Sequence, residues 1–312
     1  MNKCTIIQYH YVHNPSSDFP KVYTKTVEDF KAQLNYVSKN YDVISLGDYV
    51  AYLNGQKEIS KKTCILTFDD GLSDHYNNVY PILKKLNLPA TFFVSTSPLE
   101  TKQILPVQML QCLLAEVDAE FLIDEYHKLL KRFYPKNYDE YYVTNNPQKQ
   151  GIYYSSDWYK PEVINLKCAI GKMTHDMKIK ILESLFLEHI GTHDEYCNKL
   201  YMTWDNIKEM SENGFEIGSH AVTHSMLTTL SKGELQFELY ESKEVIEYNL
   251  NKKVNAFSEP WGAYNDDIIN EIKKYYNCCV NSAFKVNVGR CSPYNLYRMD
   301  TTIVPGGKDE EK

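Results

Sequence analysis

Residues 63–71 read TCILTFDDG, an apolar run that ends in two adjacent carboxylates and a glycine. Short runs of this kind, rich in β-branched and aromatic residues, are typical of a strand that is buried on both faces of a sheet. Asp69 and Asp70 follow the run directly. Because a buried carboxylate costs free energy unless it is paired or hydrogen-bonded, we expect this strand to end at a polar site.

Similar apolar runs recur on both sides of this strand, and helical patterns separate most of them. The predicted strands are residues 4–10, 42–46, 63–70, 90–95, 215–220, 254–260, 277–283 and 301–304. The predicted helices among them are residues 27–39, 47–54, 74–86, 203–213, 232–249 and 266–276. Strands that alternate with helices predict a parallel α/β fold, either an open sheet or a barrel.

The alternation of strands and helices stops over residues 99–200, where two long helical patterns flank a stretch rich in Tyr, Asn and Pro. A connection of this length is too long to be an ordinary loop. We therefore expect residues 1–98 and 201–307 to form the α/β unit together. Residues 99–200 would be an insertion or lid that could also form an oligomer interface, and residues 308–312 a disordered tail.

Composition excludes several classes of function. The chain has 312 residues, 43% of them hydrophobic, and a net charge of −7, so we expect no nucleic-acid partner, since phosphate binding needs a basic face. No window approaches the ~18 apolar residues of a membrane span. The N-terminal apolar run is shorter than the roughly 7–15 residues of a signal peptide core, and the eight cysteines form no C-x-x-C pair. We expect a cytoplasmic protein with reduced thiols.

Polar residues stand at the ends of several predicted strands. Functional residues of parallel α/β folds gather at the C-terminal ends of the strands. The residues in such places are His10, Asp69, Asp70, His220, His224, Glu259 and Trp261. His220 and His224 have the i, i+4 spacing that directs two side chains to the same side of a helical turn.

A catalytic zinc site needs three protein ligands and one open position. His220, His224 and one carboxylate suit Zn²⁺, and also Fe²⁺, Co²⁺ or Ni²⁺. Either Asp69 or Asp70 could be the carboxylate ligand. The other would then be free to take a proton from a water that the metal activates.

Three sequence motifs resemble those of the polysaccharide deacetylases, the NodB-homology group of carbohydrate esterases. They are TFDDG at 67–71, SHAVTH at 219–224 and EPWGAYND at 259–266. Two weaker elements, YHYV at 9–12 and NLYRMD at 295–300, resemble the subgroup of poly-N-acetylglucosamine deacetylases. The resemblance implies an irregular (β/α)7 barrel of NodB-homology type with a helical insertion at residues 99–200, which carry none of these motifs.

The resemblance also implies a reaction, the metal-dependent removal of an N-acetyl group from an acetamido sugar or glycan with release of acetate. By position, Asp69 would be the general base, and Asp70 would bind the metal with His220 and His224. The substrate partner would be an N-acetylated sugar or oligosaccharide, in carbohydrate metabolism or glycan biosynthesis.

Two further catalytic groups follow from the same resemblance. The backbone N–H of Trp261 would help to hold the oxyanion of the tetrahedral intermediate. His10, which matches the histidine of the Tyr-His element, would be the general acid that protonates the leaving amine.

The third motif departs from the family pattern. Many members carry an arginine two residues before the proline, where this chain has Ser258, followed by the unusual Glu259. Arg298 could replace the missing arginine. We also expect Glu259, Tyr264 and Arg298 to contact the substrate.

Two alternatives remain open from the sequence. A barrel with two carboxylates could be a glycoside hydrolase, although that leaves His220 and His224 without a role. The missing arginine at position 258 and the extra Glu259 also allow a non-catalytic glycan-binding relative.

Overall fold

Seven parallel strands close into a barrel in the computed structural model, which describes residues 1–15, 21–144 and 160–306. In barrel order the strands are β1 (Lys3–Tyr9), β3 (Lys62–Phe68), β4 (Thr91–Val94), β5 (Glu216–Ser219), β6 (Ala256–Ser258), β7 (Cys278–Asn281) and β9 (Leu296–Asp300). The ring is closed because β1 pairs in parallel with both β3 and β9. Two short strands lie outside it, β2 (Asp42–Val43) beside β3 and β8 (Asn287–Val288) beside β1. The expected (β/α)7 barrel is confirmed.

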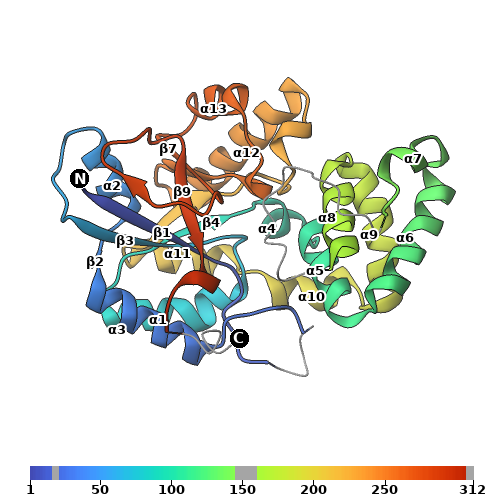
Figure 1. Ribbon diagram of the computed structural model, residues 1–312, viewed down its shortest axis with the longest axis horizontal. Helices are drawn as coiled ribbons and strands as arrows, with labels where there is room; N and C mark the ends of the chain where they lie inside the picture. Colours follow the sequence, from blue (N-terminus) through green and yellow to red (C-terminus); the bar gives the residue numbers. More distant parts are fainter. Residues whose placement is uncertain (16–20, 145–159, 307–312) are drawn as a thin grey trace.

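Helices surround the barrel (Figure 1). The surrounding helices are α1 (Val27–Asn40), the π-helical turn η1 (His75–Val79) with α3 (Tyr80–Leu86), α11 (Trp204–Glu212), α12 (Lys232–Leu250) and α13 (Asp266–Ile272). The short helix α2 (Leu46–Leu53) contributes Leu46, Tyr49 and Tyr52 to the apolar cluster inside the barrel, together with Ile6 and Phe93. That cluster fills the N-terminal half of the barrel, so the other end is left for polar groups.

Strand alternation decides which side chains reach the barrel interior. On β3, Ile65 packs in the interior cluster, whereas Leu66 and Phe68 pack outward in the cluster beneath the helices. The same period directs Thr67 and then Asp69 inward, at the C-terminal end of the strand. The apolar lower layer therefore passes into a polar upper layer within one strand.

Residues 97–144 and 160–200 form a helical unit on one side of the barrel (Figure 1). Its helices are α4 (Ser97–Thr101), α5 (Pro106–Glu116), α6 (Ala119–Phe133), the 3-10 turn η2 (Pro135–Asn137), α7 (Tyr138–Tyr141), α8 (Pro161–Lys172), α9 (His175–His189) and α10 (His193–Leu200). They share an apolar core of their own, which also takes in Leu72 and Tyr201 from the barrel side. Helices α6 and α9 match the two helical patterns predicted in this region, whereas α4, α5, α7, α8 and α10 were not predicted.

The strand predicted at residues 301–304 is wrong. Residues Thr301–Ile303 form the 3-10 turn η5, because the Asp300 carboxylate accepts a hydrogen bond from the Thr302 N–H at 2.8 Å and ends the strand there. The last barrel strand is the preceding β9. The tail predicted at 308–312 lies outside the described residues.

All eight cysteines are free thiols. Of the helices in the part of the chain that the structure describes, none has both the length and the apolar character that crossing a bilayer requires.

Gly218 on β5 provides a test of the barrel packing. A Cβ at this position would lie 2.5 Å from the Phe93 ring and 3.0 Å from the Ala256 carbonyl oxygen. We expect Gly218→Ala to lower the free energy of unfolding by about 1–3 kcal/mol, the usual cost of overpacking a core. Gly233→Ala is the control, since nothing lies within 4 Å of a Cβ there and alanine favours the helix. Equal urea midpoints for the two variants would contradict this packing.

Candidate active site

Asp69 ends β3 and is held by a buried arginine from β9. Arg298 donates from Nη1 to Asp69 Oδ1 at 2.8 Å and from Nη2 to Oδ2 at 2.7 Å. Gln8 and the Ser258 hydroxyl also donate to Oδ2, at 3.1 and 3.3 Å. Burial opposes ionisation of Asp69, but Arg298, His220 and His10 lower its pKa to about 2. The carboxylate is therefore charged and fixed in orientation.

Asp70 points away from this pair, toward two histidines. Its Oδ1 lies 3.4 Å from His220 Nε2 and 3.4 Å from His224 Nε2. One ligand atom from each of the three buried residues lies within 4.8 Å of the others. Among the described residues, Asp70 Oδ1 has no hydrogen-bond partner. Burial works against its charge, yet His220, His224 and His10 keep the pKa of Asp70 below its usual range.

The two imidazoles are oriented by the backbone around them. His220 follows β5. Its Nδ1 atom lies 2.8 Å from the Ser258 carbonyl oxygen, so its Nε2 atom faces Asp70. The loop to His224 is held by Glu238 of α12, which accepts the N–H groups of Val222 and Thr223 at 2.8 and 2.9 Å.

The protonation of the two imidazoles differs. Burial, aided by His220, lowers the pKa of His224 to about 3, so this side chain is neutral at physiological pH. Burial opposes a charge on His220 too, but Asp69 and Asp70 outweigh it and raise the pKa of His220. Metal ligands must be deprotonated, so a proton on His220 would compete with a cation bound here.

The three residues fit a divalent cation. Two ligands of a tetrahedral zinc ion lie roughly 3.3–3.4 Å apart, given bonds of about 2.0–2.1 Å. Asp70 Oδ1 has this separation from both Nε2 atoms. The orphaned oxygen and the two ring nitrogens therefore make a possible metal site.

The backbone is strained around these residues. Four non-glycine residues of the three motifs have positive φ, Asp70 at 76°, Ala221 at 64°, His224 at 55° and Trp261 at 64°. Such conformations are uncommon for residues with a Cβ and cluster at functional sites. At Asp70 the strain turns its carboxylate away from that of Asp69.

His10 and Trp261 lie near the same centre. His10 follows β1, and its Nε2 is 3.5 Å from the Gln8 amide nitrogen that also binds Asp69. Trp261 belongs to the 3-10 turn η4 (Pro260–Gly262), and its indole N–H donates to the His224 carbonyl at 2.9 Å. Tyr264 is half-buried just after this turn.

Two residues expected to bind substrate are deeply buried. Arg298 is fully buried, and its guanidinium is used by Asp69 and Ser258. Glu259 is 2% exposed, and its Oε1 lies 3.5 Å from the Cys279 thiol. Since Ser258 points into the barrel, the next side chain points outward. Both side chains are thus engaged within the protein, and their contact with substrate stays a prediction.

Two glutamines near the carboxylates were not predicted. Gln8 binds Asp69, and Gln108 of α5 donates to Asp70 Oδ2 at 2.9 Å. Gln8 lies in the apolar run TIIQYH, and Gln108 lies with Gln111 in the run PVQMLQCLL. An amide within such a run is the signal that could have indicated them, because a buried amide needs a polar partner.

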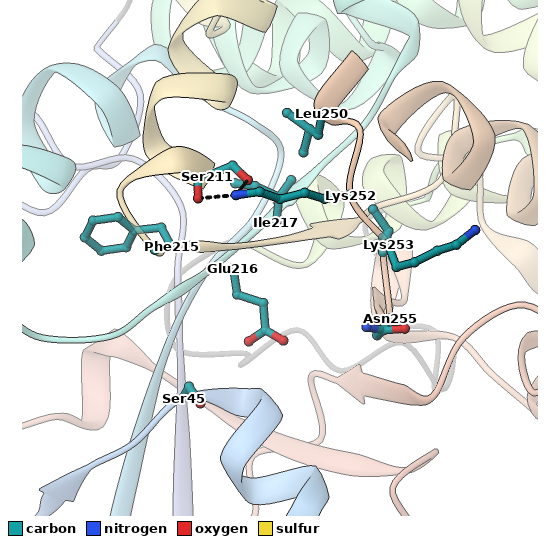
Figure 2. Close-up of a pocket in the computed structure, with 11 residues that line it drawn as sticks. Ser45, Ser211, Phe215, Glu216, Ile217, Leu250, Lys252, Lys253 and Asn255 are labelled. Carbon is teal, nitrogen blue, oxygen red and sulfur yellow. Dashed lines mark hydrogen bonds between the residues drawn. The ribbon is translucent and has the colours of Figure 1, made fainter. Parts of the chain in front are cut away.

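A separate pocket of about 360 Å³ lies at the opposite, N-terminal ends of β5 and β6 (Figure 2). Lys252 donates there to the carbonyl and hydroxyl oxygens of Ser211 at 2.7 and 3.0 Å. Glu216 faces the same space and accepts from Thr91 at 2.9 Å. None of the predicted site residues lines this pocket.

The family of the chain is now clear. The polysaccharide deacetylase family matches residues 56–131 and 176–277, more than half of the 312 residues. The chain belongs to the polysaccharide deacetylase family.

Its relatives by sequence are distant. YxkH of Bacillus subtilis is 21% identical over 274 residues, which cover 87% of this chain and 61% of that protein. The poly-beta-1,6-N-acetyl-D-glucosamine N-deacetylase of Staphylococcus epidermidis is 30% identical over 109 residues, 31% of this chain and 37% of that protein. The chain thus spans less than two thirds of the length of either relative.

The fold is shared along nearly the whole chain with a solved structure. The Streptococcus pyogenes deacetylase PplD, solved in complex with acetate, is 20% identical with a TM-score of 0.61. The match covers 99% of this chain and 95% of that one. At this identity the likeness supports the barrel fold.

The buried pair of Asp69 and Arg298 predicts a large effect on stability. Arg298→Met leaves a buried carboxylate without its cation, which costs about 3–5 kcal/mol. We expect Asp69→Asn to recover part of that loss in the double variant. Arg290→Met is the control, because its pair with Glu58 is exposed and worth under about 1 kcal/mol. If urea unfolding gave the same loss for Arg290→Met and Arg298→Met, the pair would not be the constraint inferred here.

Glu259 predicts a pH dependence of stability. Burial raises its pKa from 4.5 to about 8, so between these values the folded chain keeps a proton that the unfolded chain has lost. Stability must then fall as pH rises through this window. We expect Glu259→Gln to flatten that fall, with a melting temperature at least about 2 °C above wild type at pH 8. Glu244→Gln, at an exposed position of α12, should retain the wild-type slope, and the same slope in Glu259→Gln would refute the burial effect.

Proposed function

We propose that the chain is a metal-dependent carbohydrate N-deacetylase, which hydrolyses the N-acetyl group of an acetamido sugar or glycan and releases acetate. The observation that carries the proposal is the separation of the two adjacent carboxylates. Asp69 is engaged by Arg298, whereas Asp70 presents one free oxygen to two imidazoles. Hydrolysis of an amide needs a base and an electrophile side by side, and this arrangement supplies residues for both.

Asp70, His220 and His224 would hold the cation. Their two nitrogens and one oxygen are the donor set that zinc prefers in catalytic sites, and Co²⁺, Ni²⁺ or Fe²⁺ accept the same donors. When bound, the cation would act as a Lewis acid that acidifies the attacking water and polarises the amide carbonyl.

Asp69 is the proposed base. A carboxylate with a pKa of about 2 is ionised at all physiological pH values, but it is a weak proton acceptor on its own. Asp69 contributes to catalysis through its fixed position, which Arg298, Gln8 and Ser258 provide. Asp69 takes the proton of the attacking water as the carbon–oxygen bond forms.

The other two roles belong to residues at the same barrel end. The backbone N–H of Trp261 donates to the developing oxyanion, and the strained turn holds this N–H in place. His10 gives a proton to the sugar nitrogen as the carbon–nitrogen bond breaks, leaving acetate and a free amine. The Tyr264 ring follows Trp261 closely in the chain and is the remaining candidate for contact with the sugar.

The substrate class is supported by the names of relatives. The Staphylococcus epidermidis relative is named for poly-beta-1,6-N-acetyl-D-glucosamine, so a glycan with β-1,6-linked N-acetylglucosamine is the first substrate to test. A role in glycan biosynthesis, a cytoplasmic location, and a lid or oligomer interface at residues 99–200 stay predictions.

Asp69→Asn tests the proposed base. The variant should lose at least about 100-fold of the rate of acetate release, the lower range for general base catalysis. It should still bind one divalent cation per chain, because the substitution leaves Asp70 and both histidines unchanged. Acetate is measured with β-1,6-linked N-acetylglucosamine oligomers, and metal content by elemental analysis.

Asp70→Asn is the matched variant and should lose both metal and activity. Retained acetate release by Asp69→Asn would refute its role as base. Shortened oligomers without acetate would favour a glycoside hydrolase, and binding without any product would favour a glycan-binding protein.

A further inference from the structure

The inserted helical unit reaches the predicted metal ligand through one side chain. Gln108 lies in the first turn of α5, is fully buried, and donates from Nε2 to Asp70 Oδ2 at 2.9 Å. The other oxygen of that carboxylate, Oδ1, faces His220 and His224. The two oxygens of Asp70 therefore have different environments, one amide and one pair of imidazoles.

The orientation of the Gln108 amide is fixed by a second buried residue. The Tyr201 hydroxyl accepts the Leu105 N–H at 3.1 Å and donates to Gln108 Oε1 at 3.0 Å. A carboxylate can only accept hydrogen bonds, so the NH₂ end of the amide must face Asp70. The hydrogen bonds all point in one direction. Leu105 donates to Tyr201, Tyr201 donates to Gln108, and Gln108 donates to Asp70.

The two ends of the insertion meet at this point. Leu105 and Gln108 belong to its first part, and Tyr201 directly follows its last helix, α10. Tyr201 also forms an antiparallel bridge with Leu72, and the next N–H, of Met202, donates to the Gly71 carbonyl at 3.0 Å. The loop that carries Asp70 is thus clamped by the chain that enters and leaves the insertion.

We infer that Gln108 and Tyr201 are positioning residues for Asp70, which hold its Oδ2 so that Oδ1 alone is presented to a metal ion. The inference rests on the proposed function, since it concerns the metal site. It makes the insertion a structural part of that site. Residues that orient a metal ligand typically change metal affinity by about 10- to 100-fold when they are removed.

The test is metal affinity of the whole chain after its metal has been removed with a chelator. Gln108→Met keeps the volume and removes the amide, and we expect Zn²⁺ binding about 10- to 100-fold weaker in competition with a chromophoric chelator. Tyr201→Phe removes one hydroxyl and should weaken binding in the same direction by a smaller factor. The visible spectrum of bound Co²⁺, which responds to its ligand geometry, should change in Gln108→Met.

The matched controls are Gln111, one turn along α5, and its partner Tyr11, which lies just after β1. Gln111 accepts a hydrogen bond from the Tyr11 hydroxyl at 2.7 Å, but no hydrogen bond joins it to Asp70 among the described residues. Gln111→Met and Tyr11→Phe should bind Zn²⁺ as wild type does. If these controls lost as much affinity as the Gln108 and Tyr201 variants, general loosening of the insertion would explain the effect and overturn the inference.

The outcomes separate the two proposals. Wild-type affinity in Gln108→Met would overturn the positioning role and leave the proposed function intact. A wild-type chain without affinity for Zn²⁺ or Co²⁺ would refute both. If circular dichroism showed that Gln108→Met does not fold, Tyr201→Phe would decide, with unchanged affinity and an unchanged Co²⁺ spectrum counting against the inference.

Discussion

The buried ion pair between Asp69 and Arg298 is the constraint on which the site depends. The two residues come from strands on either side of β1, so they meet only when the barrel is closed in register. A buried pair is stable only if its remaining donors are satisfied. Arg298 meets this condition by donating to Asn281, Thr67 and Ser258 as well. The same contact between β3 and β9 residues therefore requires a closed barrel and orients the candidate base.

Ser258 shows how this chain dispenses with an arginine on β6. A long side chain at that position would compete for the space that the Arg298 guanidinium fills from β9. The small hydroxyl instead accepts from Arg298 at 2.9 Å and donates to Asp69 at 3.3 Å. The charge beside the carboxylate is thus kept, while the strand that supplies it has changed.

The barrel and the grouping of the acidic residues with the two histidines could be predicted because their signals are local. Asp69, Asp70 and His220 each directly follow an apolar run, and strand alternation fixes the side of the sheet on which they emerge. The role of Gln108 could not be predicted, because it depends on a contact with Asp70, which lies 38 residues away in the sequence. Helix α5, with Pro106 at its start, is also apolar on most sides, so its sequence has no clear amphipathic period. The burial of Glu259 beneath the helices could not be predicted either, because the charge of a residue does not show to which side of a strand it points.

Adjacent acids with different roles require that the backbone separate them. In an extended strand the two side chains would already alternate, but Asp70 has left the strand and has a φ of 76°. That strain must be balanced by contacts around the loop. Contacts on both sides of the loop compensate for the strain. The barrel holds Asp69 through Arg298, and the insertion holds Asp70 through Gln108. A chain that kept the barrel and lost α5 would retain all three motifs, yet Asp70 Oδ2 would have lost its buried donor. The motifs alone therefore do not define this site, because one of their carboxylates is completed by a segment that lies outside them.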